Sequence, residues 1–411
     1  MMGLGLSGAH GTIRQLRFKM VRKIETILAQ AGRAPIKQYG LVNPPLKRGS
    51  TVLHESVAAK REIGRRAALE PVENYGIMGN ETHFALEAAL AEMEGGTHAQ
   101  VTSSGLSAIT MPLLAYLKTG EHLLVPDSVY GPTRTFCDST LKRFGIETTY
   151  YDPLISPAAL ESLFRPTTKV LFTESPGSHS FEVQDIPALA NVAHAHGAKV
   201  FLDNTWGILH FSPFSHGVDV SIHALTKYVG GHSDLILGAV VVNTPEDWRW
   251  LRLGSLELGN YASPDDCWLA LRGLRSLNVR LKAAEAAGLH IAQWFSKQPE
   301  VARVLHPALP DCPGHEFFKR DFTGSCGLFG VVFKPQFSPE DVVRMIDALK
   351  MFGIGASWGG FESLVLPTTG TITRSAGTGV FEGPPARFQI GLENIDDLIA
   401  DLQQGLRALY A

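Results

Sequence analysis

The chain reads FLDNTW at residues 201–206 and SIHALTKY at residues 221–228. Each segment starts as a short apolar strand; the first ends in Asp203, and the second is followed by Lys227. In a parallel sheet the carboxyl ends of the strands share one edge, and ligands bind along that edge. We therefore expect the Asp203 carboxylate and the Lys227 amine to face a common site.

The sequence around these segments alternates between strands and helices. Short apolar runs predict buried strands at residues 122–125, 168–172, 199–202 and 238–242. Helical stretches lie between them at residues 132–144, 157–163 and 186–196. Gly145 and Gly197 occupy positions where helix C-caps belong. This rhythm predicts an α/β fold, with a mostly parallel sheet and helices on both of its faces.

Three regions are expected along the chain. Residues 1–70 are interpreted as an N-terminal extension and an inter-subunit arm, with a disordered start and Met20 as a candidate natural start. Residues 71–263 form the large domain, which includes a helix at 82–93. Residues 264–411 form a connecting helix, at about 264–297, and a smaller C-terminal α/β domain, with strands at 327–333 and 387–391 and helices at 339–352 and 395–409.

Composition excludes several classes of protein. The chain has 411 residues, of which 45% are hydrophobic and 19% charged, as is usual for soluble globular proteins. A formal net charge of -3 argues against nucleic-acid binding and against a basic membrane-surface protein. Four widely spaced cysteines favour free thiols in a reducing compartment, so we expect a cytoplasmic protein without zinc. No apolar run is long enough to span a membrane.

A third segment completes a set of groups suited to one cofactor. Residues 102–107, TSSGLS, lie where a loop should lead into a helix N-terminus. Backbone N–H groups at such a position bind phosphate. An aspartate keeps a pyridine nitrogen protonated, and a lysine amine condenses with an aldehyde. Each feature alone is more often a cap, a turn or a surface residue, but together and in this order they favour pyridoxal 5'-phosphate (PLP).

The residues around Lys227 also carry a resemblance. The stretch TKYVGGHSD at 226–234, with DNT at 203–205 before it, resembles the Cys/Met-metabolism family of PLP-dependent enzymes. The segments HPALP (306–310), GHEF (314–317) and SWGGFES (357–363) resemble the bacterial cystathionine β-lyase branch of that family. The resemblance covers nearly the whole chain from Lys19 onward. It implies the PLP-dependent transferase fold of type I and a homotetramer built from active-site dimers.

The family implies a role for each matching residue. Lys227 would form the internal aldimine and shuttle a proton, and Asp203 would pair with the pyridinium nitrogen. Tyr130 would stack on the ring and take part in catalysis. The phosphate would be held by Ser104, Gly105, Leu106 and Thr226, and the phosphate of the neighbouring subunit by Tyr75. Arg387 would hold the substrate carboxylate, with Ser357 nearby. No metal is expected. His223 is interpreted as a strand residue with its hydrogen bonds satisfied.

One position departs from the family pattern. Family members carry an arginine two residues after the tyrosine equivalent to Tyr75, and it joins that tyrosine at the partner subunit's phosphate. Here the chain reads YGIMGNET at 75–82, so Ile77 holds the arginine position and Glu81 adds a negative charge nearby. Either another cation or the helix N–H groups compensate, or the pocket has changed its substrate, for example to a cationic amino acid such as canavanine.

These implications lead to a lyase acting on a small amino acid. The predicted reaction is a PLP-dependent elimination that cleaves a side-chain bond and releases a 2-oxo acid and ammonia. Carbon–sulfur β-elimination from cystathionine or a related amino acid is the first choice. A γ-lyase and an amino-acid racemase are the alternatives. A non-enzymatic binding module is disfavoured, because binding alone does not need both Lys227 and Asp203.

Overall fold

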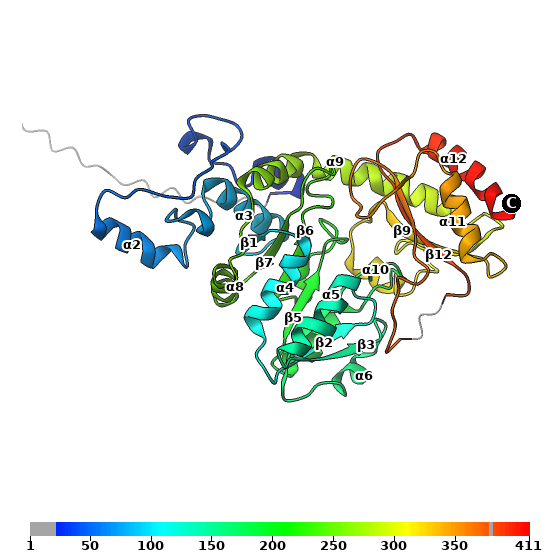
Figure 1. Ribbon diagram of the computed structural model, residues 1–411, viewed down its shortest axis with the longest axis horizontal. Coiled ribbons are helices and arrows are strands. Elements are labelled where there is room, and N and C mark those ends of the chain that lie inside the picture. The colour runs from blue at the N-terminus through cyan, green and yellow to red at the C-terminus, as the bar shows by residue number, and fades with distance from the viewer. Residues whose placement is uncertain (1–21, 378–380) are drawn as a thin grey trace, which may run out of the picture.

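The computed structural model describes residues 22–377 and 381–411. The predicted disordered start and the candidate start at Met20 lie outside the described residues. Figure 1 shows three parts along the longest axis of the molecule. An arm that carries α2 (Val57–Ala67) lies at one end, a sheet with its helices lies in the middle, and a second sheet with α11 (Pro339–Ala348) and α12 (Ile395–Arg407) lies at the other end.

The central sheet has seven strands in the order β1-β7-β6-β5-β4-β2-β3. Their bounds are β1 (His98–Thr102), β2 (His122–Pro126), β3 (Glu147–Tyr151), β4 (Thr168–Glu174), β5 (Lys199–Asp203), β6 (Val220–Ala224) and β7 (Gly238–Val242). Every pairing is parallel except those that β7 makes with β1 and β6. The mostly parallel sheet predicted from the sequence is confirmed. The expectation that every strand ends on one edge is wrong for β7, because residues 225–237 return from β6 without a crossover helix.

Helices cover both faces of this sheet, which is why its strands are almost continuously apolar. On one face pack α4 (Gly105–Tyr116), α5 (Gly131–Phe136) and α8 (Pro245–Glu257). On the other face pack α3 (Glu81–Glu94), α7 (Ile186–Ala195) and the first part of α9 (Pro264–Phe295). Alternate residues of β7 divide between the two cores: Val240 and Val242 face α4, whereas Ala239 and Val241 face α3.

The second sheet has five strands in the order β10-β11-β12-β9-β8. Their bounds are β8 (Val301–Leu305), β9 (Leu328–Phe333), β10 (Gly353–Ile354), β11 (Leu364–Pro367) and β12 (Pro385–Gln389). The end of α9 packs on this sheet together with α11 and α12, while α10 (His315–Asp321) lies closer to the central sheet. The smaller C-terminal α/β domain is therefore confirmed, and α9 connects the two sheets as the sequence predicts. The boundaries at residues 70 and 263 stay predictions.

Several local expectations are refined. Gly145 and Gly197 both adopt the left-handed conformation of a helix end, with φ of 73° and 69°. The helix expected at 132–144 forms as α5 followed by a π-helical turn, Cys137–Leu141. The arm contains an unpredicted helix, α2, besides α1 (Ile24–Gln30). The four cysteines are buried and free. Within 22–377 and 381–411 no helix is long and apolar enough to cross a membrane.

Candidate active site

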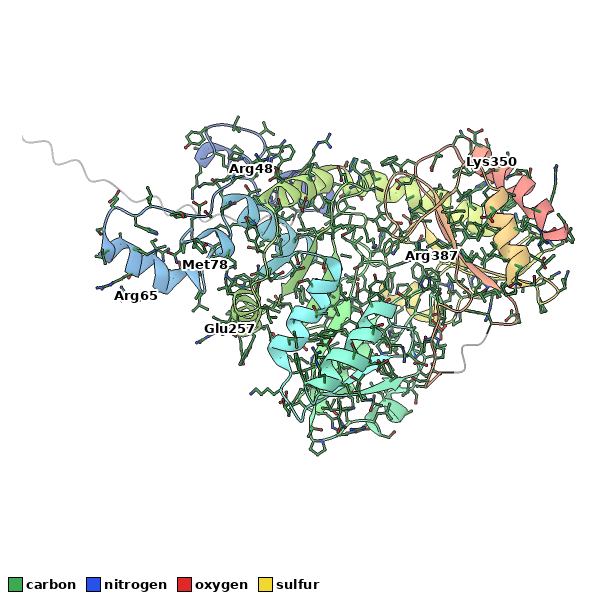
Figure 2. All side chains as sticks on the ribbon, in the orientation of Figure 1. Arg48, Arg65, Met78, Glu257, Lys350 and Arg387 are labelled. Carbon is green, nitrogen blue, oxygen red and sulfur yellow. The ribbon has the colours of Figure 1, made fainter. Side chains whose placement is uncertain are left out.

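A cavity of about 490 Å³ opens where the carboxyl ends of β4, β5 and β6 meet the second sheet. It is lined by every predicted site residue except Tyr75, namely Ser104, Gly105, Leu106, Tyr130, Asp203, Thr226, Lys227, Ser357 and Arg387. These residues come from both halves of the chain. Figure 2 shows Arg387 on the second sheet, beside the central sheet, and Ser357 also comes from the C-terminal part, between β10 and β11. The structure thus brings together residues that are up to 283 positions apart (387 − 104).

Lys227 lies in the turn that follows β6, and its amine points into the cavity. The Lys227 Nζ donates to Ser357 Oγ at 2.7 Å and lies 5.4 Å from the centre of the Trp358 ring. Burial, together with the positive charge of Arg387, lowers the pKa of Lys227 to about 8, against the opposing effect of Asp203. About one tenth of this amine is therefore neutral, and nucleophilic, at pH 7, far more than for an ordinary lysine.

Asp203 ends β5, and its carboxylate is held by Thr205. Asp203 Oδ1 accepts from the Thr205 hydroxyl at 2.6 Å and from the Thr205 N–H at 3.0 Å. Burial raises the pKa of Asp203, and these two hydrogen bonds act in the opposite direction. One carboxylate oxygen is thus fixed, and the other remains available to a group in the cavity.

A second carboxyl, Glu174, lies beside Asp203. The two are register partners at the ends of β4 and β5. Glu174 accepts from Ser178 Oγ at 2.6 Å and from the Tyr130 N–H at 2.8 Å. Burial and the neighbouring Asp203 raise the pKa of Glu174 to about 8, so this side chain carries a proton at neutral pH.

The start of α4 forms a cradle for an anion. Ser104 caps the helix by accepting from the Ser107 N–H at 3.0 Å. As the first residues of the helix, Gly105 and Leu106 have no helical carbonyl for their N–H groups, and the helix dipole is positive there. A Cβ on Gly105 would lie 2.6 Å from the Cβ of Ala224. Only glycine therefore lets the helix start approach β6 this closely.

The Arg387 side chain spans the cavity wall from β12. It is 8% exposed, and its Nη2 donates to the Ser357 carbonyl at 2.9 Å. Its Nε has no hydrogen-bond partner within the described residues. Ser357 adopts a left-handed conformation with φ 75°. This backbone turns the Ser357 hydroxyl toward Lys227 and its carbonyl toward Arg387.

The remaining predicted residues differ in how they present their groups. Tyr130 is 42% exposed and lines the cavity. Burial, Glu174 and Asp203 raise its pKa, so it is a neutral phenol near neutral pH. The Thr226 hydroxyl donates to the Leu237 carbonyl at 3.2 Å and accepts from the Leu237 N–H at 3.1 Å. These bonds fix the turn that carries Lys227.

The SWGGFES segment supports this turn from the second sheet. Gly359 has φ 81°, and a Cβ there would lie 2.8 Å from the Tyr228 nitrogen and 3.1 Å from the Cα of Lys227. From the other side Arg280 of α9 donates to the Tyr228 carbonyl at 2.8 Å. The tryptophan-glycine-glycine motif therefore positions the backbone of Lys227, and it places Trp358 beside the amine.

Tyr75 lies elsewhere, in a separate hollow on the arm. That hollow is lined by Arg48, Tyr75 and Ile77 among others. Figure 2 shows Arg48 and Met78 far from Arg387, so within one subunit Tyr75 does not reach the cavity. Tyr75 is 52% exposed. Arg48 is a cation in the same hollow as Ile77, and its Nε donates to Asp265 at 3.0 Å.

The cavity fits PLP on the chemistry of its groups. It offers helix N–H groups for a phosphate, an ionisable carboxylate for a ring nitrogen, a lysine amine of lowered pKa for an aldehyde, and an arginine side chain for a carboxylate. Comparison with known proteins decides between this assignment and others. The family described as Cys/Met metabolism PLP-dependent enzyme matches residues 25–407.

The chain belongs to this family.

Individual relatives agree with the family match. The chain is 44% identical over 391 residues to the cystathionine β-lyase of Bordetella avium, covering 94% of this chain and 98% of that protein. It is 40% identical over 391 residues to cystathionine β-lyase MetC of Escherichia coli, covering 93% and 98%. A crystal structure of cystathionine γ-lyase from Lactobacillus plantarum, complexed with L-serine, superposes with a TM-score of 0.86 at 29% identity and covers 95% of this chain and 100% of that one. The fold of type I and the dependence on PLP, both expected from the sequence, are confirmed.

Sequence reasoning missed Glu174, Thr205 and Trp358 as residues of the site. Glu174 could have been found, because it follows the apolar strand expected at 168–172 at the same edge as Asp203. Thr205 was quoted without a role, although a hydroxyl two residues after a carboxylate is placed to bond to it. Trp358 gave no signal, since its place beside Lys227 depends on how the two sheets meet.

Proposed function

We propose that this family member is a carbon–sulfur lyase that carries out β-elimination on cystathionine or a related amino acid. The observation that carries the proposal is the convergence of Lys227, Asp203 and Arg387 on one cavity. Relatives that bear the name cystathionine β-lyase support the choice of substrate. The products would be a 2-oxo acid, ammonia and a thiol.

In this proposal each residue has a defined task. Bound PLP supplies the electron sink that stabilises negative charge at the substrate Cα. Lys227 anchors the cofactor and then, as a neutral amine, removes the Cα proton. Arg387 lines the cavity and binds the substrate carboxylate through its guanidinium, which fixes the direction of the Cα–H bond. Ser357 fixes the positions of the Lys227 and Arg387 side chains by accepting a hydrogen bond from each, through its hydroxyl and its carbonyl respectively.

The other residues hold the cofactor. Gly105 and Leu106 offer N–H groups to the phosphate, with Ser104 fixing the helix start. Asp203 keeps the ring nitrogen protonated. Tyr130, which lines the cavity as a neutral phenol, stacks on the ring. Thr226 secures the turn before Lys227. Its hydroxyl proton is donated to the Leu237 carbonyl, so the predicted bond to the phosphate would require that contact to be released.

Product analysis tests the reaction directly. The purified holoenzyme is incubated with L-cystathionine, and the 2-oxo acid is identified. Pyruvate is the expected product, because β-elimination leaves a three-carbon fragment. 2-Oxobutyrate would instead establish the γ-lyase. Conversion of L-alanine to D-alanine without ammonia release, with no 2-oxo acid from cystathionine, would establish the racemase and overturn the proposal.

A cationic substrate is the second candidate, and it rests on Ile77. Arg48 is a cation in the same hollow as Ile77, but within one subunit its charge is paired with Asp265. Compensation by Arg48 therefore requires it to exchange Asp265 for the phosphate. Comparing kcat/KM for cystathionine and canavanine decides between compensation and a change of substrate. A preference for canavanine would reject compensation by Arg48.

The assembly and the compartment follow from the same reasoning. Tyr75 is exposed and remote from the cavity of its own subunit. We propose that it completes the phosphate site of a neighbouring subunit in an active-site dimer, with two dimers forming a tetramer. Four buried free cysteines support a reducing, cytoplasmic environment. Sedimentation of the holoenzyme measures the assembly, and a monomer with full activity would contradict it.

A further inference from the structure

A buried cluster of polar side chains lies beneath the strand ends that carry Asp203 and Lys227. Glu94, the last residue of α3, accepts a hydrogen bond from Ser221 Oγ at 2.7 Å, and its Oε2 lies 2.9 Å from His223 Nε2. Asn204 Nδ2 donates to the same carboxylate at 3.4 Å. The side chains of His223 and Glu94 are 0% and 2% exposed. Such a pair must be matched in charge and hydrogen bonding to be tolerated in the interior.

The cluster is not explained by structural satisfaction alone. His223 Nδ1 is buried, and it finds no hydrogen-bond partner among residues 22–377 and 381–411. The sequence-based interpretation of His223 as a fully satisfied strand residue is therefore wrong at this atom. A histidine that only filled the core would leave this polar nitrogen at a cost of roughly 1–3 kcal/mol. The unpaired Nδ1 does not itself indicate a charge. The case for a charged ring rests on the Glu94 carboxylate, 2.9 Å from Nε2.

The position of His223 connects it to Asp203. Ile222 is the register partner of Asp203 on the neighbouring strand, and His223 follows it. The Ala224 N–H donates to Thr205 Oγ1 at 2.9 Å, and that hydroxyl donates to Asp203 Oδ1 at 2.6 Å. The strand end that carries His223 is thus tied to the carboxylate through Thr205.

Electrostatics agree with this connection. Burial alone would lower the pKa of His223, but Glu94 from α3 and Asp203 from β5 outweigh it, and the pKa of His223 is raised. In return, His223 acts to lower the pKa of Asp203, against the effect of burial. An imidazolium at this place therefore favours the ionised form of Asp203.

The ionisation of Asp203 matters because Asp203 and Glu174 compete for one proton. The two carboxyls are adjacent and buried, and Asp203 raises the pKa of Glu174, whereas His223 and Lys227 act to lower the pKa of Asp203. Glu174 and Asp203 each accept two hydrogen bonds from neighbouring groups. The positive charge of His223 acts on Asp203 and so biases the proton toward Glu174.

We propose that the buried Glu94–His223 pair is a charge relay behind Asp203, and that His223 is a positioning residue that keeps Asp203 ionised toward the ring nitrogen of the cofactor. The inference rests on the proposed role of Asp203, and it is independent of which amino acid is the substrate. His223 does not touch the cavity, so it acts on the cofactor through Asp203.

The experiment is a pH titration of the visible absorption of the purified holoenzyme, with the PLP dissociation constant measured in parallel. In His223→Gln the ring nitrogen loses part of its protonation, so the cofactor becomes more electron-rich and holds its imine proton more tightly. The midpoint of the titration is expected to rise by about one pH unit and PLP to bind about tenfold more weakly. Glu94→Gln keeps a hydrogen-bond acceptor but removes the anion that holds His223 charged, so its midpoint should move in the same direction.

Two further variants separate the possible outcomes. Ser221→Ala removes the hydroxyl that contacts both Glu94 and His223 but removes no charge, and its midpoint should stay at the wild-type value. Asp203→Asn should give the largest upward shift. If Asp203→Asn shifts the midpoint but folded His223→Gln and Glu94→Gln do not, the relay is wrong. If Asp203→Asn also gives no shift, the proposed role of Asp203 fails first. Should His223→Gln not fold, Glu94→Gln alone decides.

Discussion

At the scale of single residues, the chemistry depends on how two cations share one cavity. Lys227 must lose its charge to attack an aldehyde, whereas Arg387 must keep its charge to bind a carboxylate. Burial lowers the pKa of both, to about 8 for the lysine and about 10 for the arginine. Because an arginine starts from a much higher value, the same environment leaves Arg387 charged and Lys227 partly neutral at pH 7.

The pH dependence of cofactor capture tests the lowered pKa of Lys227. The rate constant for reaction of the apoenzyme with PLP should rise with pH, because only the neutral amine attacks. The midpoint should lie at about 8. Arg387→Met removes the repelling charge and should move the midpoint upward. A wild-type midpoint close to that of a free lysine, about 10.4, would contradict the account.

Substitution of Arg387 tests its role in substrate binding. Arg387→Lys keeps the charge but loses the planar guanidinium and its paired donors. We expect kcat/KM to fall about a hundredfold, equivalent to about 2.7 kcal/mol, with the PLP dissociation constant unchanged. Steady-state kinetics and fluorescence titration with PLP measure the two quantities. Equal loss of cofactor affinity would show that Arg387 supports the cavity and not the substrate.

Some of these residues could be predicted from the sequence and others could not. Lys227 and Asp203 follow apolar strands, so the pattern alone places them at one edge. The contact between Lys227 and Ser357 could not be predicted, because it joins residues of two sheets and needs the left-handed backbone of Ser357. The lowering of the Lys227 pKa by Arg387 likewise depends on how the two sheets pack against each other.

At the scale of elements, the start of α4 is placed by close packing against β6. Gly105 lies where any side chain would meet Ala224. The helix cap at Ser104 and the absence of a Cβ at Gly105 together set the N–H groups at the cavity wall. The phosphate site is therefore a property of how this helix meets this strand.

Gly105→Ala tests this packing. The added methyl would lie 2.6 Å from the Ala224 Cβ, so the helix start must shift away from β6. We expect PLP to bind about tenfold more weakly and the protein to lose about 1–3 kcal/mol of stability. Gly64→Ala in α2 is the matched control, since a Cβ there meets nothing within 4 Å. Unchanged PLP affinity in folded Gly105→Ala would contradict the assignment of the phosphate site.

The elements also show where sequence patterns stop being informative. Strands buried on both faces, such as β5 and β7, read as apolar runs and were predicted. β3 carries the polar sequence ETTYY at the edge of the sheet and was missed, because one-sided burial leaves no continuous apolar run. α2 has mostly exposed residues, and its apolar face is narrow, carried by Ala59, Ile63 and Ala67, so it was missed.

At the scale of the whole molecule, the separation of Tyr75 from the cavity of its own subunit predicts that the active site is shared between subunits. Within one subunit the arm lies at the far end of the central sheet from Arg387 (Figure 2). If the site needs Tyr75, another subunit must bring it. The departure at Ile77 then concerns the contact between subunits, where Arg48, paired with Asp265 within its own subunit, lies in the same hollow.

Complementation between inactive variants tests the shared site. Lys227→Ala lacks the amine, and Tyr75→Ala is expected to lose most of its activity. In a mixed dimer, one site combines the intact Lys227 of one chain with the intact Tyr75 of the other. Refolding an equimolar mixture should therefore restore about a quarter of wild-type activity, because half of the dimers are mixed and each has one intact site. Failure to exceed the sum of the two separate variants would place Tyr75 outside the neighbouring site.

The most direct measurement for the central claim is reduction of the PLP-loaded protein with borohydride, followed by digestion and mass spectrometry of the labelled peptide. Reduction converts the imine into a stable secondary amine and so records which lysine held the cofactor. The account predicts a single phosphopyridoxyl label on Lys227, absent in Lys227→Ala and retained in the exposed-site control Lys169→Ala. A label on any other lysine, or no label on protein that retains bound PLP, would contradict it.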